Sequence, residues 1–141
     1  MFIVTVKTSF PATHRVCLPD GRLETAHRHE WEVRARFARP YLDDHGKVVD
    51  FDHARAALES AVQPLRNADL NDCPVLAEHM PTAEVLARYV FDRLRASGFG
   101  AVCRVEILEA PGCEAAYEPG CGLNHPTPGD ELTMDTAGRR L

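Results

Sequence analysis

The segment HRHEWEVRARF, residues 27–37, determines how the rest of this chain is interpreted. From Trp31 to Phe37, apolar side chains alternate with charged ones, which is the pattern of a half-buried strand. The same alternation places His27 and His29 on the face of Trp31. Two such imidazoles, joined by His14 from a neighbouring strand, could form a three-nitrogen zinc site with one open position, as in catalytic zinc sites. Taken alone, an H-x-H pair is more often incidental than metal-binding.

Composition predicts one globular domain with a buried core. The chain has 141 residues, 45% of them hydrophobic and 26% charged, as is ordinary for such a domain. A net charge of −5 gives no support for binding nucleic acid, so no nucleic-acid partner is expected. No stretch approaches the length of a membrane span, so no membrane partner is expected either.

The apolar start and the cysteines indicate a cytoplasmic protein. Residues 1–6 are apolar, but they lack a basic leader and are too short for a signal peptide, so they are interpreted as the beginning of a strand. Five cysteines are an odd number, and none forms a C-x-x-C pair. Reduced thiols in a cytoplasm are the simplest interpretation of that pattern.

The spacing of apolar residues predicts an α+β chain with the order ββααββ. The first helical face begins at Phe51 and ends or kinks at Pro64, and the second helix opens at Pro81-Thr82, with Thr82 as N-cap. Gly98 ends the second helix. The expected strands are 2–10, 27–38, 101–108 and 113–118, and turns are expected at 19–21 and 43–46.

We therefore expect a domain at 1–119 and a Gly/Pro-containing tail at 120–141, a loose arm ordered only against another subunit. Glu109 stands out in the domain because it shares the parity of Val105 and Ile107, the apolar face of the third strand. Such a carboxylate is either an end-of-strand charge that reaches water or an anchor for a ligand.

Six short motifs occur in one order along the chain. They are F-x-A-x-H at 10–14, an H-x-H followed by an aromatic at 27–31, G-x-V-x-D-F at 46–51, Leu70-Asn71, P-T-x-E at 81–84, and the late pair Glu109 and Tyr117. In this order they resemble the 6-pyruvoyltetrahydropterin synthase and 6-carboxytetrahydropterin synthase family. The matches run from about residue 9 to residue 117, nearly the whole domain.

The resemblance implies a T-fold, an antiparallel sheet with two helices on one face, closed into an oligomeric barrel. It implies a homo-oligomer, a hexamer made of two trimers, that binds a small-molecule pterin or related heterocycle at subunit interfaces. Glu109 would accept the ring N–H and amino group of that ligand, a charge-assisted and geometrically selective pair. Thr82 would assist at the pocket wall, and His14, His27 and His29 would hold zinc.

The chain departs from the family pattern at the residues that carry out proton transfer. The usual cysteine, four residues before the first histidine of the H-G-H motif, is replaced by Leu23, and Cys17 lies too far away to substitute. The usual Asp-His pair is replaced by Arg66 and Asn67, neither of which does acid–base work at ordinary pH. Arg28 replaces the glycine, and a nearby cation disfavours a metal ion.

One further residue keeps a catalytic alternative open. Glu24 lies three residues before His27, as in a branch of the family in which glutamate replaces the cysteine. That branch is linked to cleavage of dihydroneopterin triphosphate to a 6-hydroxymethylpterin. Glu24 is therefore either the base of a zinc-dependent lyase or a solvated loop residue.

Three functional classes follow from these residues. The favoured one is a pterin-binding homologue that does not carry out the standard synthase reaction, and the alternative is the lyase that uses Glu24. A purely structural oligomer is disfavoured, because packing does not require Glu109 or Thr82.

Overall fold

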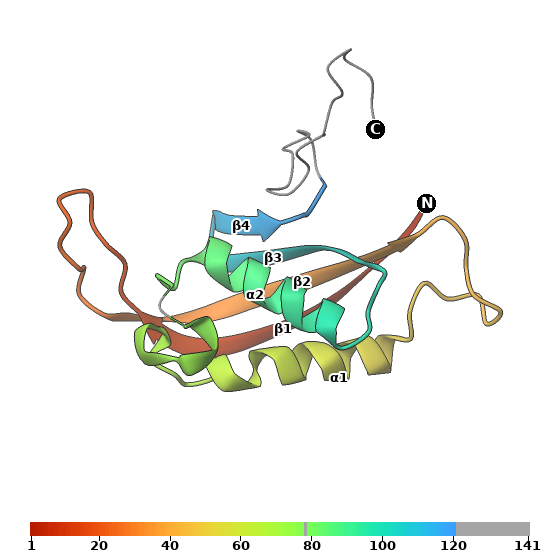
Figure 1. The fold of residues 1–141 in the computed structure, drawn as a ribbon, viewed down its shortest axis with the longest axis horizontal. Helices are drawn as coiled ribbons and strands as arrows, with labels where there is room; N and C mark the ends of the chain where they lie inside the picture. Colours follow the sequence, from red (N-terminus) through yellow and green to blue (C-terminus); the bar gives the residue numbers. More distant parts are fainter. Residues whose placement is uncertain (78, 121–141) are drawn as a thin grey trace, which may run out of the picture.

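The protein folds into a four-stranded antiparallel sheet in the order β1-β2-β3-β4, covered by two helices on one face (Figure 1). The structure is a computed structural model and describes residues 1–77 and 79–120. The strands are β1 (Phe2–His14), β2 (His27–Arg39), β3 (Val102–Ala110) and β4 (Cys113–Tyr117), and the helices are α1 (Phe51–Val62) and α2 (Ala83–Ala96). Short 3₁₀ turns occupy Gln63–Leu65, Leu70–Asp72 and Pro74–Leu76. The predicted ββααββ order is confirmed.

β1 continues four residues beyond its predicted end at residue 10. It pairs with β2 over its whole length, from Phe2 opposite Arg39 to His14 opposite His27. Pro11 lies inside this strand, where it is tolerated because β1 is an edge strand of the sheet. The extension carries His14 to the position directly across from His27.

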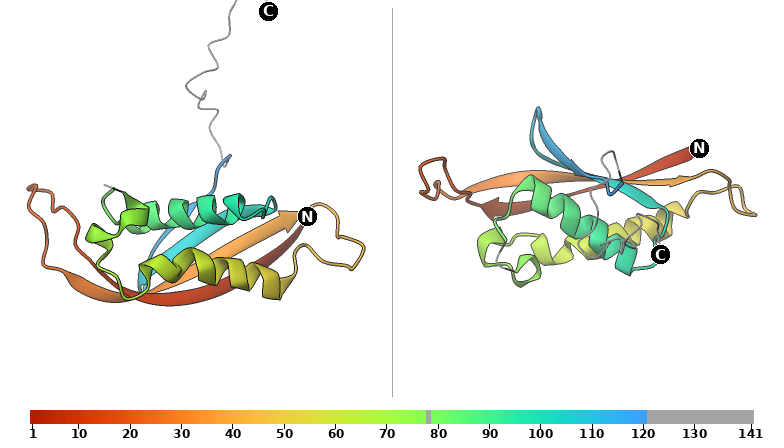
Figure 2. Two further views of the ribbon diagram at one scale, coloured as in Figure 1. Left: turned by 60° about the horizontal axis from the view of Figure 1, so that its bottom comes forward. Right: turned by 45° about the horizontal axis from the view of Figure 1, so that its top comes forward.

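The core lies between the sheet and the helices. Figure 2 shows α1 and α2 side by side over the same face of the sheet. Phe10, Trp31 and Phe37 point to that face from the strands and are fully buried, as are Leu58 and Leu86 from the helices. Fully burying one such side chain contributes about 1.5–3 kcal/mol, so this apolar layer is the main source of stability.

The helix boundaries follow from local chemistry, as predicted. The Asp50 side chain accepts a hydrogen bond from the His53 N–H at the start of α1, and the Thr82 hydroxyl accepts one from the Val85 N–H at the start of α2. Pro64 is the second residue of the 3₁₀ turn Gln63–Leu65, which directly follows α1. Gly98 adopts φ +93°, the left-handed conformation that terminates α2.

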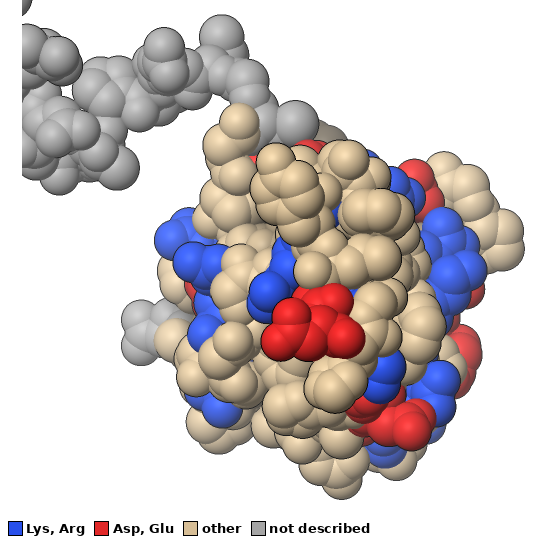
Figure 3. Space-filling model, turned by 90° about the vertical axis from the view of Figure 1, so that its right-hand side faces the viewer, with Lys and Arg blue, Asp and Glu red and all other residues tan. Residues whose placement is uncertain are grey.

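Acidic and basic side chains are neighbours on the end of the molecule shown in Figure 3. Among the ion pairs of the protein, Lys47 Nζ lies 2.9 Å from Asp50 Oδ2. The four cysteines in the described part of the chain are free thiols. Among the helices of that part, none has both the length and the apolar character of a membrane span. Of the expected tail at 120–141, residues 121–141 lie outside the described residues.

Candidate metal centre

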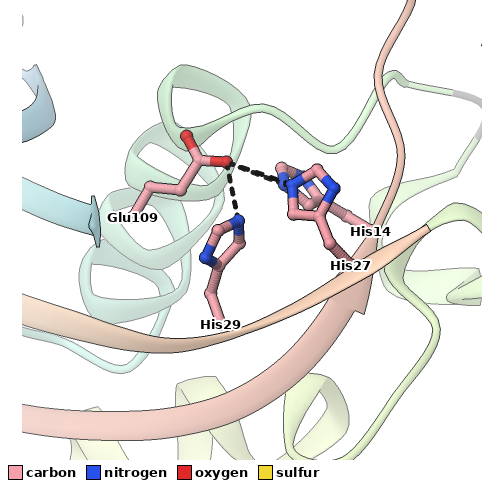
Figure 4. Close-up of side chains that lie close together, drawn as sticks. All are labelled: His14, His27, His29 and Glu109. Carbon is pink, nitrogen blue, oxygen red and sulfur yellow. Dashed lines mark hydrogen bonds and ion pairs between the residues drawn. The ribbon is translucent and has the colours of Figure 1, made fainter. Parts of the chain in front are cut away.

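Three histidines converge where β1 ends and β2 begins, as the sequence predicted. The Nε2 atoms of His14 and His27 lie 3.0 Å apart, and the three imidazoles pack edge to face with ring centroids 4.5–5.3 Å apart. Trp31 lies beneath them, 4.7 Å from the His14 ring. Figure 4 shows the three rings and the carboxylate of Glu109 pointing toward a common centre.

The backbone fixes the tautomers of two of these rings. His14 Nδ1 lies 2.8 Å from the Pro81 carbonyl oxygen, and His27 Nδ1 lies 3.1 Å from the Thr25 carbonyl oxygen. A carbonyl oxygen only accepts, so each Nδ1 carries the proton and donates it. In the neutral rings, each Nε2 then carries a lone pair that points toward the centre of the cluster. Such hydrogen bonds from the outer nitrogen are the usual support for histidines that bind metal.

The third ring leaves its nitrogen without a hydrogen bond. His29 Nε2 is buried and has no hydrogen-bond partner, although it lies 3.3 Å from Glu109 Oε1. Desolvation lowers the pKa of His29, against the opposing effect of the Glu109 charge. The neutral form of His29 is thereby favoured, and this is the form that binds a metal ion.

Glu109 contributes the fourth atom of the cluster. Glu109 comes directly after Leu108, which is the last residue of β3 that pairs with β2. On the other side of β3, the pairing with β4 shifts in register between Leu108 and Ala110. Such irregularities redirect side chains beside functional sites. Its Oε1 lies 2.8 Å from His14 Nε2, 3.3 Å from His29 Nε2 and 3.9 Å from His27 Nε2.

These four atoms suit a divalent cation. Three imidazole lone pairs and one carboxylate oxygen meet with all their ligand atoms within 4.8 Å of one another, and like acceptors at such distances repel unless a cation lies between them. Zinc–nitrogen bonds of about 2.0–2.1 Å imply edges of about 3.3–3.4 Å in a tetrahedron. Four of the six separations between these atoms are known individually, and at 2.8–3.9 Å they lie on either side of that edge length. The donor set therefore fits zinc.

The cluster opens to solvent at His27. The exposed fraction of the side chain is 1% for His14, 23% for His29 and 37% for His27. Glu24 lies at the open side: its Oε1 is 3.5 Å from His27 Nε2 and accepts a hydrogen bond from the Val16 N–H at 3.1 Å. Glu24 lies in the loop between β1 and β2, and its hydrogen bond to Val16 holds the carboxylate beside His27.

The residues that depart from the family pattern have partners of their own. Leu23 is 53% exposed and offers no ionisable group. Arg66 Nη2 donates to Glu59 Oε2 at 3.1 Å. Arg28 Nη2 donates to Asn67 Oδ1 at 2.7 Å, so two of the departures bind one another. Arg28 thus has a hydrogen-bond partner away from the histidines.

Two supports of the site were not anticipated from the sequence. The Pro81 carbonyl accepts a hydrogen bond from His14 Nδ1. Thr82, the next residue, was expected at a pocket wall and is the N-cap of α2. Asn71 accepts from the Arg15 N–H and donates to the Arg15 carbonyl, both at 2.9 Å, which fixes the chain immediately after His14. The P-T and Leu-Asn motifs in the sequence could have indicated these two supports, because Pro81 and Asn71 belong to them.

Comparisons with known proteins agree with this architecture. The model of the 6-pyruvoyl tetrahydropterin synthase family matches residues 3–120. The 6-carboxy-5,6,7,8-tetrahydropterin synthase of Synechocystis sp. is 30% identical over 122 residues, which span 83% of this chain and 93% of that protein. The chain therefore belongs to the 6-pyruvoyl tetrahydropterin synthase family.

Solved structures support the same fold. The Caenorhabditis elegans 6-pyruvoyl tetrahydropterin synthase superposes with a TM-score of 0.70 at 20% identity, over 84% of this chain and 96% of that one. The Plasmodium vivax 6-pyruvoyl tetrahydropterin synthase gives 0.60 at 17% identity, over 83% and 98%. The expected fold of one subunit, an antiparallel sheet with two helices on one face, is thereby confirmed.

Proposed function

We propose that this protein binds a pterin-like bicyclic heterocycle at a subunit interface, beside a zinc ion held by His14, His27 and His29. We further propose that it makes neither 6-pyruvoyl- nor 6-carboxytetrahydropterin efficiently. The observation that carries the first part is the convergence of three histidine nitrogens and the Glu109 carboxylate at one partly open centre. Membership of a pterin synthase family supports the choice of ligand.

Glu109 is the anchor for the heterocycle in this proposal. Its side chain is 30% exposed, so a ligand at the open side of the cluster can reach the carboxylate. A carboxylate that faces two neighbouring N–H donors forms a charge-assisted pair with fixed geometry, as the edge of a pterin ring requires. Thr82 would assist at the pocket wall through groups that its capping role leaves free.

The absence of the standard reaction follows from the side chains that replace the usual acid–base groups. Leu23 has no proton to exchange, and the Arg66 guanidinium is paired with Glu59. The Asn67 amide does no acid–base work and accepts from Arg28. Losing a positioned general base lowers the rate by about two to four orders of magnitude.

A second function is favoured by the position of Glu24. Its carboxylate lies 3.5 Å from His27, at the open side of the cluster, where it could accept a proton from a bound ligand. Bound zinc would polarise a hydroxyl or carbonyl of the ligand side chain. The chain would then be a lyase that converts dihydroneopterin triphosphate to a 6-hydroxymethylpterin. A catalytic glutamate also occurs in the Plasmodium vivax synthase, which has been solved with that residue replaced.

Incubation of the zinc-loaded protein with dihydroneopterin triphosphate, followed by mass spectrometry, separates these functions. We expect retained pterin without 6-pyruvoyl- or 6-carboxytetrahydropterin. Turnover to either of those products at rates typical of the family would overturn the proposal. A 6-hydroxymethylpterin that disappears in Glu24→Gln would establish the lyase instead.

Calorimetry with 7,8-dihydroneopterin tests the anchor. Glu109→Gln should weaken binding strongly, because the amide presents a donor where the ring also presents one. The matched control is Glu114→Gln, which changes an exposed carboxylate on β4 and should bind normally. Unchanged affinity in Glu109→Gln for every pterin and purine tested would mean that the pocket is misplaced.

A further inference from the structure

Glu109 reaches the histidine cluster, and the proposed function also makes it the anchor of the heterocycle. One oxygen, Oε1, makes all three of its contacts with the histidine cluster, at 2.8, 3.3 and 3.9 Å from the Nε2 atoms. These separations average close to the edge of about 3.3–3.4 Å expected for a zinc tetrahedron. Oε1 therefore lies near the fourth corner, the position that an open catalytic site leaves to water or substrate.

Glu24 is the other carboxylate beside the cluster, and it suits this corner less well. Its Oε1 is near only one ring, 3.5 Å from His27, and the same oxygen accepts from the Val16 N–H. Among the described residues, the group with all ligand atoms mutually within 4.8 Å contains Glu109 and not Glu24. Glu109 is thus the carboxylate positioned to complete the coordination.

We propose that Glu109 is a displaceable fourth ligand of the metal. It binds the metal through Oε1 when the pocket is empty and leaves it when a heterocycle pairs with the carboxylate. The exchange rests on the proposed function, in which Glu109 receives a two-donor ring edge. That pairing draws both carboxylate oxygens toward the ring, so it competes with the bond from Oε1 to the metal. Release of Oε1 would leave the fourth position of a bound metal to an oxygen of the ligand side chain.

Metal binding without any heterocycle tests the ligand role by itself. Zinc affinity is measured by competition with a chromophoric chelator in the native protein, Glu109→Gln, Glu109→Asp and the control Glu114→Gln. We expect Glu109→Gln to bind zinc about 100-fold more weakly or worse, because loss of a mere outer partner already costs 10–100-fold. Glu109→Asp keeps the charge but shortens the reach by one methylene, so it should also lose affinity. The control should match the native protein.

Cobalt-substituted protein reports the exchange directly, because the intensity of the visible bands of Co²⁺ depends on its coordination. Adding 7,8-dihydroneopterin should change the spectrum of the native protein. In Glu109→Gln the metal-only spectrum should already differ from native, and 7,8-dihydroneopterin should leave it unchanged.

Equal zinc affinity and equal cobalt spectra in the native protein and Glu109→Gln would overturn the inference. If that variant nevertheless lost binding of 7,8-dihydroneopterin, the proposed function would stand without it. If zinc affinity fell while no form of the protein bound any pterin, Glu109 would be a permanent ligand. In that case both the exchange and the proposed function would fail.

Discussion

His14 is a constrained residue of the candidate metal centre, because its two nitrogens face different partners. Nδ1 donates to the Pro81 carbonyl, and Nε2 faces His27 and Glu109. The side chain is only 1% exposed, so no water replaces either contact. Its substitution should therefore affect both metal content and stability.

His14→Ala should lower zinc from about one equivalent per chain to less than about a tenth, because two imidazoles hold the ion poorly. It should also destabilise the fold by about 1–3 kcal/mol, since the buried Pro81 carbonyl loses its donor. Elemental analysis of protein purified without chelator measures the first effect, and urea denaturation the second. His45→Ala, in an exposed turn, is the matched control. If the native protein itself held less than about a tenth of an equivalent after added zinc, the three histidines would not form a zinc site.

The individual site residues differ in how far the sequence could predict them. His27 and His29 followed from strand alternation, which Trp31 and its apolar neighbours make unambiguous. The approach of Glu109 to the histidines did not follow, because it depends on a register shift between β3 and β4. The contact of His14 with the Pro81 carbonyl could not be predicted either, because every residue has a backbone carbonyl and the residue type does not show which one accepts.

At the scale of elements, Thr82 caps α2 and follows the residue that binds His14. Thr82→Ala should destabilise the protein by about 0.5–2 kcal/mol, because the Val85 N–H loses its acceptor. Thr82→Ser keeps the hydroxyl and should retain most of the stability. Urea denaturation of the three proteins measures this difference, and equal midpoints for native and Thr82→Ala would show that the cap contributes nothing.

The two helices are joined by the Tyr89 hydroxyl, which donates to the Ala61 carbonyl at 3.1 Å. Burial raises the pKa of Tyr89 above its ordinary value of 10.0. The folded state therefore holds this proton more tightly than the unfolded state. The stability that Tyr89 contributes is fully present below pH 10.0 and is lost as the pH rises through the raised pKa.

Tyr89→Phe removes the hydrogen bond and the titrating group together. At neutral pH it should destabilise the protein by about 0.5–1.5 kcal/mol. The difference from native should shrink as the pH rises above 10.0, because the native protein then loses the contribution of Tyr89. Urea denaturation at both pH values measures the two differences. A difference that stayed constant with pH would contradict the assignment.

Element boundaries were predictable wherever a local chemical signal marks them. Asp50, Thr82 and Gly98 each mark a helix end through a cap or a left-handed turn. The end of β1 was placed too early because Pro11 suggests a break in a strand. Only the pairing with β2 reveals that Pro11 lies at an edge, where a missing N–H is harmless.

At the scale of the whole molecule, the sheet has two edges, β1 and β4. Unpaired strand edges invite association, and closure of a barrel through neighbouring subunits would cover them. We expect a mass of three or six times the 15.7 kDa chain in light scattering at micromolar concentration. A mass of 15.7 kDa would contradict the predicted trimer or hexamer. The order of the motifs predicted the fold of one subunit. The number of subunits depends on how the exposed surfaces of several chains fit together, which the fold of one chain does not determine.

The pairing of β1 with β2 has a kinetic consequence. Residues 2–39 form one local hairpin, whose strands meet over their full length and bring His14, His27 and His29 together at the connecting loop. Glu109 joins them only after the chain has passed through both helices. Short loops close far faster than long ones, so the hairpin and its three nitrogens should assemble early in folding. Refolding with Co²⁺ should show an early absorption change followed by a slower one, and the slower change should be missing in Glu109→Gln. The metal would then bind the β1–β2 hairpin before Glu109 reaches it.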